Sequence, residues 1–97
     1  MYRALSRIDL CDNALSPNAE IIVYSRRGCH LCDLLLEELD PLVQGRARIV
    51  VRDVDERAQW RDEYGLQVPV VWAGGAILCY YHLDKAAVTR WLAVQPV

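Results

Sequence analysis

The stretch Arg26–Cys32, with the sequence RRGCHLC, carries two cysteines that are separated by two residues. An apolar run, residues 21–24, precedes it, and a leucine-rich segment, residues 31–39, follows it. A Cys-x-x-Cys pair at a strand-to-helix junction lies near unpaired backbone N–H groups, where the helix dipole favours a thiolate on the first cysteine. The stretch therefore predicts a reactive dithiol at the start of a helix.

The segments beside the dithiol predict a strand–helix–strand unit. Residues 20–25 are continuously apolar in their centre, which is typical of a central strand covered on both faces. Leucines recur at helical spacing from Leu31 to Leu42, and Pro41 is expected to end or kink this helix near Asp40. Residues 46–54 are rich in β-branched side chains and predict a second strand, parallel to the first, with a right-handed crossover.

The second half of the chain predicts a short helix, a hairpin and a last helix. Asp55 is a good N-cap for the short helix. Gly74-Gly75 is typical of the turn of a β-hairpin. Asp84 is the expected N-cap of the last helix. The predicted helices are residues 56–64 and 84–94. Residues 66–71 are expected to lead through Val68-Pro69 into the third strand, and residues 76–80 form the predicted fourth strand.

Composition limits the class of protein. The chain has 97 residues, 54% of them hydrophobic, and a formal net charge of −2. It has no basic stripe for nucleic acid, no apolar run long enough to span a membrane, and no apolar centre of a signal peptide near its N-terminus. We therefore expect a monomeric cytoplasmic protein with no nucleic acid or membrane partner. Residues 1–19 are expected to form a partly mobile N-terminal extension, followed by one domain over residues 20–97.

The order of the predicted elements is β-α-β-α-β-β-α, with the Cys-x-x-Cys after the first strand and Val68-Pro69 before the third. In this arrangement the chain resembles the thioredoxin superfamily, and its glutaredoxin-like branch most closely. The resemblance implies an α/β thioredoxin-like fold, with a four-stranded mixed sheet flanked by helices. It also implies a thiol–disulfide oxidoreductase activity.

The two cysteines have different expected roles. Cys29 would sit on the exposed first turn of the helix, where Arg26 and Arg27 add positive charge that favours its thiolate. Cys32 would face inward one turn later and stay protonated longer. Cys29 is therefore the predicted nucleophile, and Cys32 is the predicted resolving thiol that attacks the mixed disulfide.

The resemblance assigns further roles. Pro69 is expected to be cis beside the dithiol and to keep a metal from bridging the sulfurs, while the exposed backbone of Val68 pairs with an extended substrate. The pair encloses His30-Leu31 rather than the residues usual in thioredoxins or glutaredoxins. A protonated His30 would stabilise the Cys29 thiolate, and the alternative is a solvent-facing residue without a role.

Glutathione is an open question at this stage. Arg26 or Arg27 would hold its glycine carboxylate and Asp84 its γ-glutamyl end, by resemblance to glutaredoxins. The two glycines that glutaredoxins have in this segment are missing, because the corresponding residues here are Tyr80–Asp84. We expect no bound cofactor, and a disulfide-containing protein or a small thiol as the partner, with glutathione as one candidate co-substrate.

Two alternatives belong to other functional classes. One alternative is a thioredoxin-fold binding domain whose cysteines are not turned over. The other is a metal- or cluster-binding module that uses Cys29 and Cys32 together with either His30 or ligands from a second chain. One Cys-x-x-Cys supplies only two ligands, whereas structural zinc normally takes four, so no metal site is expected. Cys11 has no expected role, and Cys79 is expected to be a small core residue.

Overall fold

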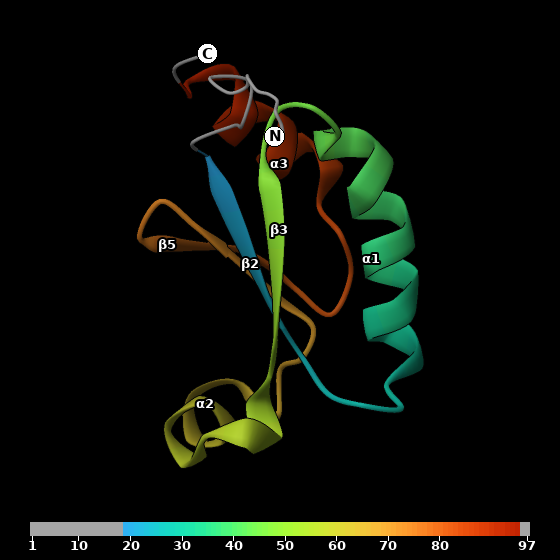
Figure 1. Cartoon of the computed structure of the whole chain (residues 1–97), viewed down its shortest axis with the longest axis vertical. Coiled ribbons are helices and arrows are strands. Elements are labelled where there is room, and N and C mark those ends of the chain that lie inside the picture. The colour runs from blue at the N-terminus through green and yellow to red at the C-terminus, as the bar shows by residue number, and fades with distance from the viewer. Residues whose placement is uncertain (1–18, 96–97) are drawn as a thin grey trace, which may run out of the picture.

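A computed structural model describes residues 19–95 (Figure 1). The predicted extension up to Asn18, with Cys11, lies outside the described residues. The strands are β2 (Glu20–Ser25), β3 (Arg48–Asp53), β4 (Val70–Ala73) and β5 (Ala76–Tyr80); the helices are α1 (His30–Val43), α2 (Ala58–Tyr64) and α3 (Lys85–Ala93), with a 3₁₀ turn, η1 (Val54–Glu56), before α2.

The four strands form one mixed sheet in the order β3-β2-β4-β5. β2 pairs in parallel with β3 and antiparallel with β4, and β4 and β5 form an antiparallel hairpin. Because β2 lies between two strands and is covered on both faces, every residue after Glu20 is buried. This confirms the predicted mixed sheet, and it explains why the apolar run of β2 is continuous rather than alternating.

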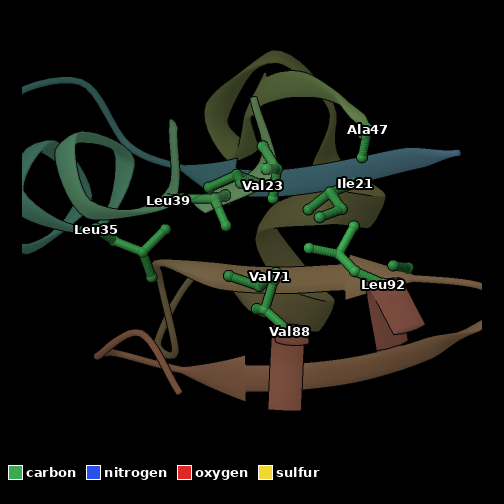
Figure 2. Packing of buried hydrophobic residues seen from close by; sticks show 10 residues of the cluster. Ile21, Val23, Leu35, Leu39, Ala47, Val71, Val88 and Leu92 are labelled. Atoms are coloured by element: carbon green, nitrogen blue, oxygen red, sulfur yellow. The ribbon is translucent and has the colours of Figure 1, made fainter. Parts of the chain in front are cut away.

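α1 and α3 cover one face of the sheet, where most of the core lies (Figures 1 and 2). Apolar side chains from both helices meet the inward side chains of the central strands. Leu35, Leu39 and Val43 come from α1, Val88 and Leu92 from α3, and Ile21, Val23, Val71 and Ala73 from β2 and β4. This packing fixes α1, and with it the two cysteines at its start, against the carboxyl end of β2.

α2 packs on the opposite face around Tyr24. The Tyr24 ring stacks on Tyr64 at a centroid distance of 4.2 Å and meets Trp60 edge-on at 5.8 Å. The Arg52 guanidinium lies 5.1 Å from the centre of the Trp60 ring, within the range of a cation–π contact, and donates to the Tyr24 hydroxyl. An aromatic cluster therefore attaches α2 to the sheet at the end where β2 leads into the dithiol.

Two local expectations were wrong. Of the two outcomes expected at Pro41, an end of α1 near Asp40 is wrong, because the helix continues through Pro41 to Val43, which is buried in the core. Asp55 does not cap a helix: Asp53 accepts from the Asp55 backbone N–H and caps η1, and α2 begins only after Arg57, without a side-chain cap. Within residues 19–95, no helix is long and apolar enough to cross a membrane.

The β4–β5 turn provides a matched test of the packing of α3. Gly74 and Gly75 both have positive φ angles, +60° and +85°. A Cβ on Gly74 would lie 2.9 Å from Nε1 of Trp91, whereas one on Gly75 would meet nothing within 4 Å. We expect Gly75→Ala to lower the free energy of unfolding by about 1 kcal/mol, the cost of a Cβ in a left-handed backbone.

We expect Gly74→Ala to lower the free energy of unfolding by about 1 to 3 kcal/mol more than Gly75→Ala does, because the Trp91 ring has to shift. Urea unfolding of the two variants measures the difference. Equal losses in both variants would show that Trp91 is not packed on this turn.

Candidate functional site: a dithiol at the start of α1

A tight turn carries the chain from β2 into α1. The backbone N–H of Cys29 donates to the carbonyl oxygen of Arg26 at 3.1 Å, and Gly28 takes the left-handed conformation, φ +81°, that closes the turn. Cys29 itself stays extended, with φ −86° and ψ 111°, and is the N-cap of α1. The turn therefore delivers the first cysteine to the positive end of the helix.

The sulfur of Cys29 takes the place of a capping oxygen. Its Sγ accepts the backbone N–H of Cys32 at 3.4 Å, one of the donors that a helix start leaves unpaired. The Cys29 side chain is half-buried, and both cysteines are free thiols. A negative charge on this sulfur would be stabilised by that N–H and by the helix dipole.

Cys32 lies in a different environment one turn later. Its exposed fraction is 2%, and burial raises the pKa of its thiol to about 12, with a further contribution from the hydrogen bond to the Cys29 side chain. A backbone hydrogen bond from Arg26 acts in the opposite direction and lowers the Cys32 pKa. At neutral pH Cys32 is therefore a protonated thiol beside Cys29.

Arg26 does not present a free guanidinium to a substrate. Its Nε donates to Asp55 Oδ2 at 3.1 Å, its Nη2 to Asp55 Oδ1 at 3.3 Å, and its Nη1 to the Gly65 carbonyl oxygen at 3.2 Å. Sequence reasoning missed Asp55 as a partner, although there was a signal. β2 and β3 are parallel and end in register at Ser25 and Asp53, so the residues just beyond both strands meet.

Pro69 lies across the sheet from the start of this turn. The β2–β4 register pairs Tyr24 with Val70, which places Pro69 opposite Ser25, and the Val68–Pro69 peptide bond is cis. The Pro69 carbonyl accepts the Tyr81 backbone N–H at 2.8 Å. Neither backbone polar group of the half-buried Val68 bonds to another residue within 19–95, so these two groups are available to a ligand.

The other predicted site residues do not converge on the dithiol. Arg27 and His30 are exposed, and their side chains form no hydrogen bond or ion pair with any other described residue. Asp84 is used locally, because its Oδ1 accepts the Ala87 N–H at 3.0 Å and caps α3. Hydrogen bonds thus link Cys29 to Cys32 and to Arg26. The register of β2 and β4 places Pro69, and with it Val68, across the sheet from the start of this turn.

Tyr81 is a neighbour of the site that sequence reasoning did not select. It has a left-handed backbone, φ +64°, which is uncommon for a residue other than glycine, and its hydroxyl donates to the Leu66 carbonyl at 3.2 Å. The Tyr81 hydroxyl and the Arg26 guanidinium therefore both donate hydrogen bonds to the segment 65–69, at the carbonyl oxygens of Leu66 and Gly65. No simple sequence signal marks this conformation.

Other reactive groups are few in the described part of the chain. Burial raises the pKa of the half-buried Cys79, which packs at the edge of the core. Among residues 19–95, no three His, Cys, Asp or Glu side chains gather as a metal-binding group. A shallow surface hollow between α1 and β3 is lined by Leu36, Glu37, Asp40 and Ile49, none of which belongs to the dithiol turn.

Comparison with known proteins places this arrangement in a family. The family described as Glutaredoxin-like domain (DUF836) matches residues 20–93. Among solved structures, target protein XcR50 from X. campestris is 31% identical, with a TM-score of 0.60 over 78% of this chain and 99% of that one. Mitochondrial thioredoxin 3 from Saccharomyces cerevisiae, in its oxidized form, is 19% identical, with a TM-score of 0.56 over 84% and 82%. No curated protein matches the sequence.

The fold is thioredoxin-like, and the adjacent Cys29 and Cys32 support a redox-type function. The matched family region runs from the start of β2 to the end of α3 and contains both cysteines. The chain belongs to the glutaredoxin-like domain family.

Proposed function

We propose that the protein is a thiol–disulfide oxidoreductase in which Cys29 is the nucleophile and Cys32 resolves the mixed disulfide. The observation that carries the proposal is the contrast between the two thiols. Cys29 is half-buried at the N-cap of α1, with its sulfur accepting the Cys32 N–H, whereas Cys32 is buried and its thiol is protonated. A partly accessible thiol at the start of a helix, next to a buried and protonated thiol, is an arrangement that two-step exchange can use.

The exchange balances over two steps. The Cys29 thiolate attacks one sulfur of a substrate disulfide, the substrate S–S bond breaks, and the other substrate sulfur leaves as a thiolate that takes a proton from water. Cys32 then loses its proton and attacks Cys29 Sγ, which releases the second substrate thiol and forms the Cys29–Cys32 disulfide. Two electrons pass from the dithiol to the substrate, and an external thiol reductant restores the pair.

The substrate is proposed to be an extended segment of a disulfide-containing protein or a small disulfide. The free backbone groups of Val68, beside the cis Pro69 and opposite the dithiol turn, support pairing with an extended chain. The exposed Arg27 and His30 are the unpaired basic side chains of this turn within residues 19–95 and would face the substrate. A reducing compartment such as the cytoplasm would keep the pair in its dithiol form.

Glutathione as co-substrate has less support than the exchange itself. Arg26 is paired with Asp55, and Asp84 caps α3, so two groups that a glutaredoxin-like glutathione site would use are engaged within the fold. Arg27 is left as the basic side chain for a glycine carboxylate. Rates of reduction with glutathione and with a dithiol reductant, measured side by side, test this part of the proposal.

A thioredoxin-fold binding domain without turnover is the second candidate. The observation that favours it is the protonation of Cys32, because a thiol that rarely ionises resolves a mixed disulfide slowly. The two candidates differ in whether the Cys29–Cys32 disulfide forms during exchange.

Serine substitutions separate the roles of the two thiols. We expect Cys29→Ser to lower the rate of disulfide reduction by about a hundredfold or more, since the nucleophile is lost. Cys32→Ser should still react once and then accumulate as a mixed disulfide, visible as an increase in mass. Cys79→Ala is the matched control and should retain the rate. Full activity of Cys29→Ser would contradict the assignment.

The raised pKa of Cys32 predicts how stability depends on pH. In the unfolded chain the thiol ionises near its usual pKa of 9.0, but in the folded protein it stays protonated up to about pH 12. Above pH 9 the unfolded state therefore gains an ionised thiol that the folded state lacks, so stability is full below pH 9 and falls as the pH rises toward 12.

Urea unfolding of the reduced protein between pH 7 and pH 11 measures this loss. Cys79, whose pKa burial also raises, contributes in the same direction, so the comparison is made in a Cys79→Ala background. In that background Cys32→Ala should flatten the decline. An unchanged decline would mean that the Cys32 thiol is not held protonated by the fold.

A further inference from the structure

Tyr81 binds the loop before β4 at two points. Its backbone N–H donates to the Pro69 carbonyl oxygen at 2.8 Å, and its hydroxyl donates to the Leu66 carbonyl oxygen at 3.2 Å. Two residues lie between these acceptors, and the second of them is Val68. Tyr81 therefore brackets the part of the loop in which the Val68 backbone bonds to no other residue within 19–95.

The backbone of Tyr81 has an uncommon conformation that allows both contacts. It lies at the centre of a tight turn directly after β5, in which the His82 N–H donates to the Tyr80 carbonyl oxygen at 2.6 Å. Its φ angle of +64° is in the left-handed region, which residues other than glycine rarely adopt. Such a conformation persists where surrounding contacts fix it. The two hydrogen bonds to the loop before β4 are contacts of this kind.

We propose that Tyr81 is a positioning residue that holds the Val68 backbone in place for an extended protein substrate and has little effect on small disulfides. The inference rests on the proposed exchange reaction, in which a substrate chain pairs with Val68 while Cys29 attacks its disulfide. An extended chain needs the N–H and the carbonyl group of Val68 at fixed positions. A small disulfide needs only access to the Cys29 sulfur, so its reaction does not depend on the loop.

The hydroxyl contact is suited to a local role. Tyr81 is 45% exposed and Leu66 is 92% exposed, so water replaces the partner of each group when the contact is lost, and overall stability changes little. Loss of the hydroxyl frees the Leu66 end of the loop, while the Pro69 end stays bonded to the Tyr81 backbone. Gln67 and Val68 then have more freedom, and an extended chain has to order them when it binds.

Two neighbouring tyrosines provide a matched pair of variants. Tyr81→Phe removes the hydroxyl and keeps the ring and the backbone N–H. Tyr80→Phe makes the same change in a side chain of similar exposure, 42%, whose hydroxyl bonds to no other residue within the described part of the chain. The two ring centres are 6.4 Å apart, so both changes fall in the same part of the surface. Circular dichroism checks that each variant folds.

The test uses the full chain with Cys11→Ser and Cys79→Ala, so that only Cys29 and Cys32 react. Two substrates carry the same reacting group, a mixed disulfide between cysteine and thionitrobenzoate. One is a single cysteine blocked at both ends, and the other is a blocked five-residue peptide of alanine and serine with a central cysteine. The Cys29 thiolate attacks the cysteine sulfur, the bond to thionitrobenzoate breaks, and the coloured anion leaves with the electron pair. Stopped-flow absorbance at pH 7 gives the rate at increasing substrate concentration.

We expect Tyr81→Phe to raise the peptide concentration at half-maximal rate by about threefold to tenfold, the effect of one ordinary hydrogen bond. The limiting rate should stay within about twofold, because Cys29 is unchanged. The single-residue substrate should react within about twofold of the background rate in both variants. Tyr80→Phe should not change the response to the peptide. In the substrate-free protein, ¹⁵N relaxation should show lower order parameters at Gln67 and Val68 in Tyr81→Phe alone.

An unchanged half-maximal concentration for the peptide in Tyr81→Phe would overturn the inference, as would an equal effect in Tyr80→Phe. Equal slowing of both substrates would also overturn it, because that is the result of a general structural role. If the peptide response weakened while the order parameters stayed the same, the hydroxyl would contact the substrate rather than position Val68. The proposed function fails in a different way: the background protein would then react with neither substrate faster than free cysteine does.

Discussion

The hydrogen bond from the Cys32 backbone N–H to the Cys29 sulfur is the interaction on which the site depends. It exists because Cys29 ends an extended segment and α1 begins at the next residue, so the sulfur is held above unpaired N–H groups. That position in turn requires β2 to end at Ser25 and Gly28 to turn the chain. The core between the sheet and α1, with α3 beside it, keeps this junction in place.

The same junction gives two identical side chains different chemistry. Cys29 is half-buried at the positive end of a helix, whereas Cys32 faces the sheet and is desolvated, which raises its pKa to about 12. The difference comes from one helical turn of displacement. The pairing of Arg26 with Asp55 and Gly65 then joins the dithiol turn to η1 and to the segment that carries Pro69, so three parts of the chain meet at one site.

Much of the fold was predictable because its signals are local. The continuous apolar run of β2, the leucine spacing of α1 and the glycines of the β4–β5 turn each specify an element without knowledge of the rest. Asp84 as the cap of α3 was also predictable from the sequence. The elements that were placed wrongly, the end of α1 at Pro41 and the start of α2, depend on burial of Val43 and on the η1 turn, which are tertiary effects.

The site was predictable only in part, for a similar reason. The proposed roles of Cys29 and Cys32 follow from their spacing, but the position of the Arg26 side chain depends on Asp55, 29 residues away, and on a backbone carbonyl that no sequence pattern marks. The sequence therefore predicted Arg26 as a substrate ligand, whereas in the structure its guanidinium is bound to Asp55 and Gly65. Tyr81, in a left-handed conformation beside Pro69, could not be found from its residue type.

Reversible formation of a disulfide between Cys29 and Cys32 is the central claim, and a redox titration of the dithiol tests it most directly. The protein is equilibrated with reduced and oxidised dithiothreitol over a range of ratios, and its free thiols are then counted by mass after alkylation. The free thiols of Cys29 and Cys32 should be lost together in a single two-electron transition. Neither Cys29→Ser nor Cys32→Ser should show this transition. Thiols that stay reduced across the range, or that oxidise without bonding to each other, would contradict the account.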